Sequence, residues 1–78
     1  MRIGKQEKIQ VQLMEDWNKN HSVGTDVIVT KDDKTKVATK TRSNAWMLGA
    51  TGDYPGHTAV ILLDGISGGY SLERVRPA

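Results

Sequence analysis

The chain has 78 residues, 37% of them hydrophobic, no Phe, no Cys and a net charge of +2. This length supports one hydrophobic core and excludes a second, so we expect residues 1–78 to form a single domain. Without Cys, neither a disulfide framework nor a thiolate metal site can form, which indicates a reducing compartment. The excess of basic residues is too small to indicate a nucleic-acid-binding protein by itself.

The first ten residues include Arg2, Lys5, Glu7 and Lys8 and contain no apolar stretch, and the longest apolar run of the chain is Ala59–Leu63. A signal peptide needs an apolar region of at least about seven residues, and a membrane-spanning helix needs about 20. We therefore expect a cytoplasmic protein with neither a signal peptide nor a membrane span.

Residues 5–20 have the pattern of a long helix. Ile9, Leu13 and Trp17 recur at intervals of four, Met14 widens this apolar stripe, and the segment lacks Gly and Pro. Apolar and polar residues also alternate in the middle of the segment, as in a half-buried strand, but the flanking Lys, Glu and Gln residues favour the helix. We expect the helix to pack through Ile9, Leu13 and Trp17.

From Val23 onward the sequence consists of short β-prone runs separated by turn signals, and none is long enough for a second regular helix. The predicted strands, in chain order, are Asp26–Lys31, a long strand from Thr35 to Leu48 with a bend or bulge near Asn44, Thr58–Leu63, a strand at Tyr70 and a short strand at Val75. A hairpin turn over Asp32–Lys34 and a 3₁₀ turn over Ser71–Arg74 complete the pattern. We expect a mainly β fold in which residues 23–77 form a small five-stranded barrel.

Three further segments carry a resemblance: Val23–Val27, Gly56–Val60 and Gly69–Pro77. Together with Trp17 and Thr41–Ala45, they resemble small SH3-like barrel proteins of bacterial and phage type. The resemblance covers most of the chain and implies an SH3-like barrel with the N-terminal helix packed on it. Its motifs are structural rather than chemical, so it implies little about function.

A similarly small barrel occurs in one enzyme family, the type II dihydrofolate reductases. These enzymes assemble as tetramers around a shared pore that carries the motif Val-Gln-Ile-Tyr. The nearest region of this chain, Gly69–Leu72, keeps neither the Gln nor the order of the motif. An oligomeric pore enzyme is therefore the most distant alternative for the function.

Other catalytic and cofactor-binding motifs are absent from the sequence. Gly65–Gly69 lacks the Gly-Lys-Ser/Thr ending of a phosphate-binding loop and leads into a strand rather than a helix. His21 and His57 are the two histidines, and neither shows metal-ligand spacing with the other or with Asp53. The serines have no paired base. We expect a protein that is not an enzyme and that binds no cofactor or metal.

Basic residues at even positions are the most informative feature of the sequence. On one continuous strand, Lys34, Lys36, Lys40 and Arg42 would project from the same face, and Trp46 shares their parity. Such a basic face could neutralise phosphates, while Trp46 could stack on an unpaired base. With two arginines near the C-terminus, the candidate nucleic-acid-binding residues are Lys34, Lys36, Lys40, Arg42, Trp46, Arg74 and Arg76.

The same basic residues also have a purely structural explanation. A charged outer face keeps an edge strand from pairing and keeps a small barrel in solution, and Asp32 and Asp33 lie beside the run. The sequence leaves the burial of Trp46 open. We expect a non-catalytic binding or assembly module whose partner is either nucleic acid or protein. A protein partner would be a further copy of the chain, paired through an exposed strand edge, or a host factor that binds a surface with Trp46 and Tyr54. Steep salt dependence would distinguish nucleic acid from protein.

Overall fold

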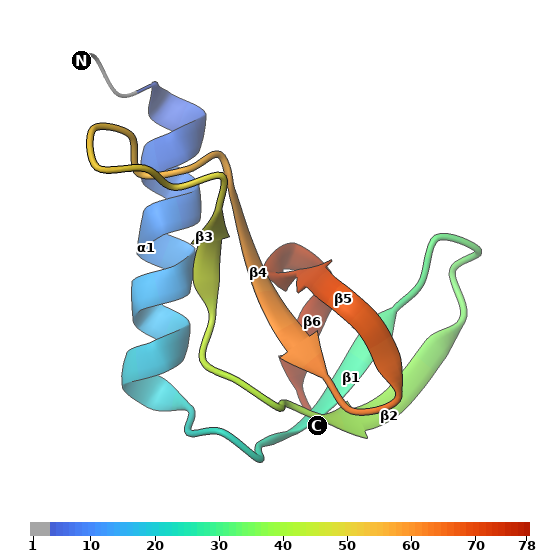
Figure 1. Ribbon diagram of the computed structural model, residues 1–78. Coiled ribbons are helices and arrows are strands. Elements are labelled where there is room, and N and C mark those ends of the chain that lie inside the picture. Colours follow the sequence, from blue (N-terminus) through green and yellow to red (C-terminus); the bar gives the residue numbers. More distant parts are fainter. Residues whose placement is uncertain (1–3) are drawn as a thin grey trace.

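The computed structural model describes residues 4–78, which form one helix, six strands and one 3₁₀ turn (Figure 1). In chain order, these elements are α1 (Lys5–Asn20), β1 (Asp26–Thr30), β2 (Lys36–Lys40), β3 (Trp46–Leu48), β4 (Thr58–Leu63), β5 (Ile66–Ser71), η1 (Leu72–Arg74) and β6 (Val75–Pro77). The predicted N-terminal helix and the mainly β character of the rest are confirmed. Residues 1–3, including Arg2 of the predicted N-terminal segment, lie outside the described residues.

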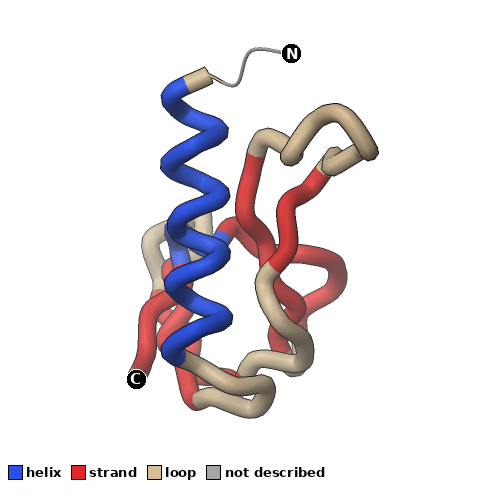
Figure 2. The backbone as a smooth tube through the Cα atoms, turned by 90° about the vertical axis from the view of Figure 1, so that its left-hand side faces the viewer, coloured by secondary structure: helices blue, strands red, loops and turns tan. Residues whose placement is uncertain are grey.

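The strands form two three-stranded sheets with the orders β2-β1-β6 and β3-β4-β5. All pairs are antiparallel. In the first sheet β1 is central, and Ile28 lies opposite both Ala38 of β2 and Arg76 of β6. In the second sheet β4 is central, and Val60 lies opposite Trp46 of β3. Figure 2 shows α1 running alongside these strands. No helix within the described range is long and apolar enough to cross a membrane.

The prediction of a five-stranded barrel is wrong, because the described chain has six strands whose two sheets do not close into a barrel. The predicted long strand is divided into β2 and β3 by residues 41–45. Within this break, Thr41 makes an isolated bridge with Leu63, and the side-chain amide of Asn18 binds the N–H and C=O groups of Ala45 at 2.8 and 2.9 Å. Because a side chain of α1 occupies these backbone groups, they cannot join a strand ladder.

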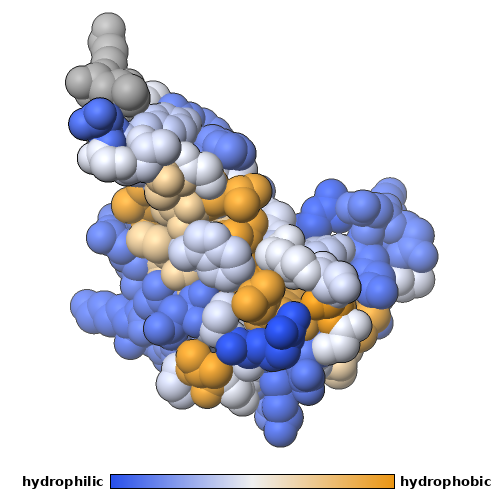
Figure 3. Space-filling view, viewed as in Figure 1, coloured by the Kyte–Doolittle hydropathy of each residue, from blue (hydrophilic) through white to orange (hydrophobic). Residues whose placement is uncertain are grey.

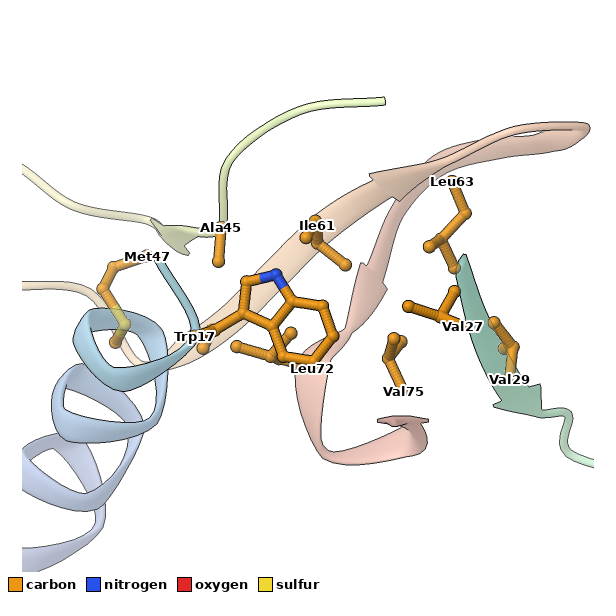
Figure 4. Close-up of a cluster of buried hydrophobic side chains, with 10 residues drawn as sticks. Trp17, Val27, Val29, Ala45, Met47, Ile61, Leu63, Leu72 and Val75 are labelled. Carbon is orange, nitrogen blue, oxygen red and sulfur yellow. The ribbon is translucent and has the colours of Figure 1, made fainter. Parts of the chain in front are cut away.

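The hydrophobic core lies between the two sheets and α1 (Figure 4). Trp17 is its largest side chain, and Figure 4 shows the indole ring directed from α1 toward Ala45, Ile61 and Leu72. The buried members of the core are Trp17, Val27, Val29, Ala45, Met47, Ala59, Ile61, Leu63, Leu72 and Val75. Each strand of both sheets except β2 and β5 supplies at least one of them, so the core holds the two sheets together.

The face that α1 buries differs from the predicted stripe at one position. Trp17 is buried and Leu13 is half-buried against the core, but Ile9 is 49% exposed. Its neighbour Gln10 faces inward instead and is 3% exposed. The amide oxygen of Gln10 accepts a 2.9 Å hydrogen bond from the N–H of Ala59, which lies beyond the last residue pair of β4 and β5. An isoleucine could not satisfy this buried donor, which explains why a polar residue occupies the inward position.

Candidate functional site

Two of the predicted basic residues lie on the outer face of the sheet β2-β1-β6. Exposed and half-buried residues alternate along β2, so Lys36 and Lys40 project outward, while Val37 and Thr39 turn toward the core. Arg76 of β6 shares the outer face, since it is in register with Ile28 at the centre of the sheet. We call this surface, defined by Lys36, Lys40 and Arg76, the basic face.

The basic face contains one acidic residue. Asp26 lies opposite Lys40 in the strand register, and its Oδ1 is 4.0 Å from the Lys40 Nζ. Both side chains are largely exposed, so this ion pair contributes little to stability. The middle of the face is apolar, because Ile28 and Ala38 are paired there between the charged positions. The basic face therefore presents three positive charges and one negative charge around a small apolar centre.

The structure separates the other predicted basic residues from this face. Lys34 lies at the tip of the β1–β2 hairpin with a φ of 68°. Arg74 belongs to η1, where its guanidinium contacts the carboxylate of Asp32 at 2.9 Å. Arg42 follows the end of β2, and its guanidinium donates hydrogen bonds to the carbonyl oxygens of Leu63 at 2.9 Å and Ile66 at 3.2 Å. The predicted set of seven thus does not form one continuous surface.

Trp46 lies on the other sheet. Because the break at residues 41–45 interrupts the alternation that begins in β2, shared parity does not place Trp46 with the lysines. Trp46 is 37% exposed on the outer side of β3, so it is neither buried in the core nor fully exposed. Tyr54, the other aromatic residue considered for a protein-binding surface, lies half-buried in the loop between β3 and β4.

The outer side of β3-β4-β5 is apolar over its central part. Ala59, Ile61 and Leu63 of β4 point into the core, so the residues between them point outward. The strand register places Trp46 and Leu48 of β3 on the same side. We call this surface, defined by Trp46, Leu48, Val60 and Leu62, the Trp46 face. Figure 3, in the orientation of Figure 1, shows apolar orange atoms over the region of β3 and β4 and polar blue atoms over the β1–β2 hairpin.

The ring of Trp46 covers the centre of this face. A Cβ atom at Gly69 would lie 3.4 Å from Trp46 Cη2 and 3.1 Å from Val60 Cγ2, so the three residues are in close contact. Val60 is therefore only 4% exposed, although it points away from the core. Leu48 is 47% exposed beside the indole. The Trp46 face thus offers an anchored aromatic ring with a free surface and an adjacent exposed leucine.

Arg42 borders the Trp46 face at the end near the β4–β5 turn. Thr41 and Leu63 form the bridge that faces the core, so the following Arg42 and the preceding Leu62 point outward. The N–H of Arg42 donates a 2.8 Å hydrogen bond to the carbonyl oxygen of Leu62, which fixes this corner. The guanidinium of Arg42 is bound to two backbone carbonyl groups, which holds its charge at the end of the apolar surface near the β4–β5 turn.

The hairpin tip of the charged sheet is held by polar contacts. The Asp33 carboxylate accepts hydrogen bonds from the Thr35 hydroxyl at 2.6 Å and from the Thr35 N–H at 3.0 Å. These bonds favour the ionised form, so they lower the pKa of Asp33 below its ordinary value. The turn leaves Lys34 in the left-handed region and Asp32 next to Arg74. Its charged groups therefore serve the local structure.

The described residues contain no group of three or more His, Cys, Asp or Glu side chains that could hold a metal ion. His21 caps the C-terminal end of α1, and its ring packs on Trp17 with the centroids 4.3 Å apart. This contact gives His21 a structural role at the end of the helix.

Two important residues, Gln10 and Asn18, were not singled out from the sequence. Both use the side-chain amide to bind backbone groups of the β-structure, at Ala59 and Ala45 respectively. Gln10 also donates a hydrogen bond to the carboxylate of Glu73, which connects α1 to η1. The sequence signal that could have indicated them is their spacing: they are eight residues apart with Trp17 between them, which places them near the helical face that carries Trp17.

Comparisons of this chain with protein-family models, with curated proteins and with solved structures found no match.

Proposed function

We propose that this protein is a non-catalytic binding module and that it binds a protein partner through the Trp46 face. The observation that carries the proposal is the exposure of Trp46 (37%) and Leu48 (47%) next to each other on one sheet, with Leu62 half-buried beside them. Single exposed apolar residues are ordinary, but a contiguous apolar patch marks an interaction surface. Tryptophan is also among the residues that contribute most to protein-protein binding.

The rigidity of the Trp46 face supports this proposal. The ring is held against Val60 and Gly69, and β4 beneath it packs into the core on its other side. A side chain that is already ordered loses little conformational entropy on binding, whereas ordering a mobile side chain costs about 0.5–1.5 kcal/mol. The face is therefore prepared to bind an apolar side chain of a partner.

A peptide-display selection tests this proposal, because it samples many partner sequences at once. We expect wild-type protein to select peptides with apolar side chains, and we expect Trp46→Ser and Leu48→Ser each to weaken their binding by about tenfold or more in fluorescence polarisation. Ile9→Ser is the matched control, because Ile9 on α1 is 49% exposed, close to the 47% of Leu48. Peptides that bind the two serine variants as well as they bind wild type would refute the proposal, provided that circular dichroism shows folded variants.

Nucleic acid is a second candidate partner, and the basic face favours it. Lys36, Lys40 and Arg76 share one side of β2-β1-β6, and Asp26 is the single acidic side chain among them. Three cations can neutralise at most about three phosphates, so the logarithm of the affinity should fall with the logarithm of salt concentration with a slope no steeper than about −3.

Fluorescence polarisation of labelled DNA and RNA oligonucleotides at two salt concentrations tests this second candidate. The triple variant Lys36→Glu, Lys40→Glu and Arg76→Glu should abolish binding. A triple exchange of Lys5, Lys8 and Lys19 to Glu on α1 changes the net charge equally and should preserve binding. Equal losses in both triple variants, or no binding at low salt, would exclude the basic face as a nucleic-acid site.

The resemblance to small SH3-like barrel proteins of bacterial and phage type stays a prediction, as do the cytoplasmic location and the lack of catalytic activity. A binding module agrees with all three. The resemblance supports the proposal only in that its motifs are structural, since none of them supplies a reactive group.

A further inference from the structure

We infer that the partner of the Trp46 face is a second copy of this chain, packed face to face about a two-fold axis. This inference rests on the proposed function and adds the identity of the partner. It differs from the strand-edge assembly considered from the sequence, because it uses the outward side chains of β3 and β4 rather than their backbone.

The small core provides the first argument. A chain of 78 residues without Cys must stabilise its fold without disulfides. Domains below about 70–80 residues rarely obtain more than 3–5 kcal/mol from one core, and self-association is one of the common supplements. Trp46 and Leu48 are the two large apolar side chains of β-strands that remain exposed in the described chain. Covering them with the same residues of another copy would extend the core of both.

The strand edges beside the Trp46 face argue for face-to-face packing. At the start of β3, both backbone groups of Ala45 are bound by Asn18, so α1 blocks strand addition there. On the other side of the sheet, the pairing of β4 with β5 shifts register between Leu62 and Leu63, and Gly68 has a φ of 72°. Irregular edges of this kind resist pairing with another strand. The flat apolar side of the sheet is what remains for a second copy.

Charges at the two ends of the face favour one orientation. Arg42 lies at the end near the β4–β5 turn, and residues 49–57, which join β3 to β4 at the opposite end, include Asp53 and no Lys or Arg. A two-fold axis in the interface, perpendicular to β4, brings the Arg42 end of each copy over the Asp53 end of the other. The same axis places the middle row of the face, Trp46 with Val60, against its equivalent. The residue expected to contribute most then lies at the centre of the interface.

The size of the face limits the affinity. β4 and β5 have six residues each and β3 has three, so strands about 4.8 Å apart with a rise of about 3.3 Å per residue cover roughly 240 Å². Stable interfaces bury about 800 Å² on each partner. Even with the loop at residues 49–57, the Trp46 face is smaller than that, so we expect a dimer that dissociates on dilution, with a Kd in the micromolar range or weaker.

Analytical ultracentrifugation of the full chain from about 5 μM to 1 mM tests this inference. The mass should rise from one chain to two with concentration, and the thermal midpoint should rise with it, since association stabilises the folded state. Trp46→Ser should weaken association by about 30-fold or more and Leu48→Ser by about tenfold. Ile9→Ser should leave it unchanged. Because Leu48 is half exposed in the single chain, Leu48→Ser should fold even if Trp46→Ser does not.

A charge reversal tests the orientation of the dimer. Asp53→Arg should weaken association several-fold, and Arg42→Glu in the same chain should restore it. A chain that stays monomeric at 1 mM would overturn the inference, as would a tetramer or a dimer that both serine variants retain. If the monomeric chain still binds selected peptides through Trp46, the proposed function stands and only the identity of the partner is wrong. If the chain binds neither these peptides nor a second copy, the proposed function and the inference of a dimer are both wrong.

Discussion

Each sheet has one outward β-branched residue at the middle of its central strand, and the surroundings of these two residues differ. Ile28 of β1 is half-buried, between Ala38 and the charged Arg76. Val60 of β4 is 4% exposed because the ring of Trp46 lies over it. The same position in two sheets of similar size is thus half-buried in one and almost fully covered in the other.

The inner faces of the two sheets do not show this difference. Val27 and Val29 of β1 and Ile61 and Leu63 of β4 are all fully buried in one core. Folding therefore makes the same demand on both sheets, and the contrast on their outer sides needs another cause. A charged outer face keeps a small protein in solution. An apolar outer face gives up that benefit, which is why we assign the binding role to the Trp46 face.

Removal of the shared core should affect both sheets and produce the largest effect. Trp17→Ala deletes the largest side chain between them and should lower the free energy of unfolding by about 3–5 kcal/mol. Ile9→Ala, on the same helix but 49% exposed, should lower it by less than about 1 kcal/mol. Urea denaturation followed by circular dichroism measures both. Similar values for the two variants would show that α1 does not pack through Trp17.

A direct comparison of the two outer faces comes from Val60→Thr and Ile28→Thr. Both variants keep a β-branched side chain, so strand propensity changes little. The hydroxyl introduced at position 60 would be enclosed under Trp46, and we expect a loss of about 2 kcal/mol. At position 28 the hydroxyl reaches water, and the loss should stay below about 1 kcal/mol. An equal loss at both positions in urea denaturation would mean that Trp46 does not cover Val60.

Local parts of this fold could be predicted from the sequence. The helix follows from an apolar stripe and the absence of Gly and Pro between Lys5 and Asn20, and the hairpin turn and 3₁₀ turn follow from residues that are neighbours in the chain. Within β2, the alternation of side chains correctly places Lys36 and Lys40 on one face. Each of these features depends on interactions over a few residues.

The features that were missed depend on contacts between distant residues. The break that separates β2 from β3 requires Asn18, which is 27 positions from Ala45. Gln10 turns inward because the N–H of Ala59, 49 positions away, has no partner in the strand ladder and donates its hydrogen bond to the Gln10 side chain instead. Hydrophobic patterns describe which side chains avoid water, but they do not show where a strand will lack a backbone partner. The separation of Trp46 from the basic residues follows from that same break.

The hairpin tip of the charged sheet should tolerate change better than its strands. Lys34 has a φ of 68°, a conformation that costs a residue with a Cβ about 1–2 kcal/mol and costs Gly almost nothing. Lys34→Gly should therefore raise the free energy of unfolding by about 1 kcal/mol. Lys36→Gly, two residues further on in β2, should instead lower it by about 0.5–1 kcal/mol. Thermal denaturation distinguishes these opposite signs, and a loss of stability in Lys34→Gly would contradict the turn geometry.

The smallest expected effect concerns the carboxylate that holds this tip. Hydrogen bonds from Thr35 lower the pKa of Asp33 in the folded state, so its contribution to stability is fully present above the unfolded value of about 3.9 and is lost as the pH falls through the lower, folded pKa. The thermal midpoint of Asp33→Ala should thus lie slightly below that of wild type at pH 7, and the difference should vanish in acid. Thr35→Val removes the hydroxyl donor and should raise the pKa of Asp33, as measured by NMR titration of the carboxyl carbon. An unchanged pKa in Thr35→Val would show that the hydrogen bond from the Thr35 hydroxyl does not organise the charged sheet at this tip. The Trp46 face, defined by Trp46, Leu48, Val60 and Leu62, has no acidic side chain, and apolar contacts organise it instead.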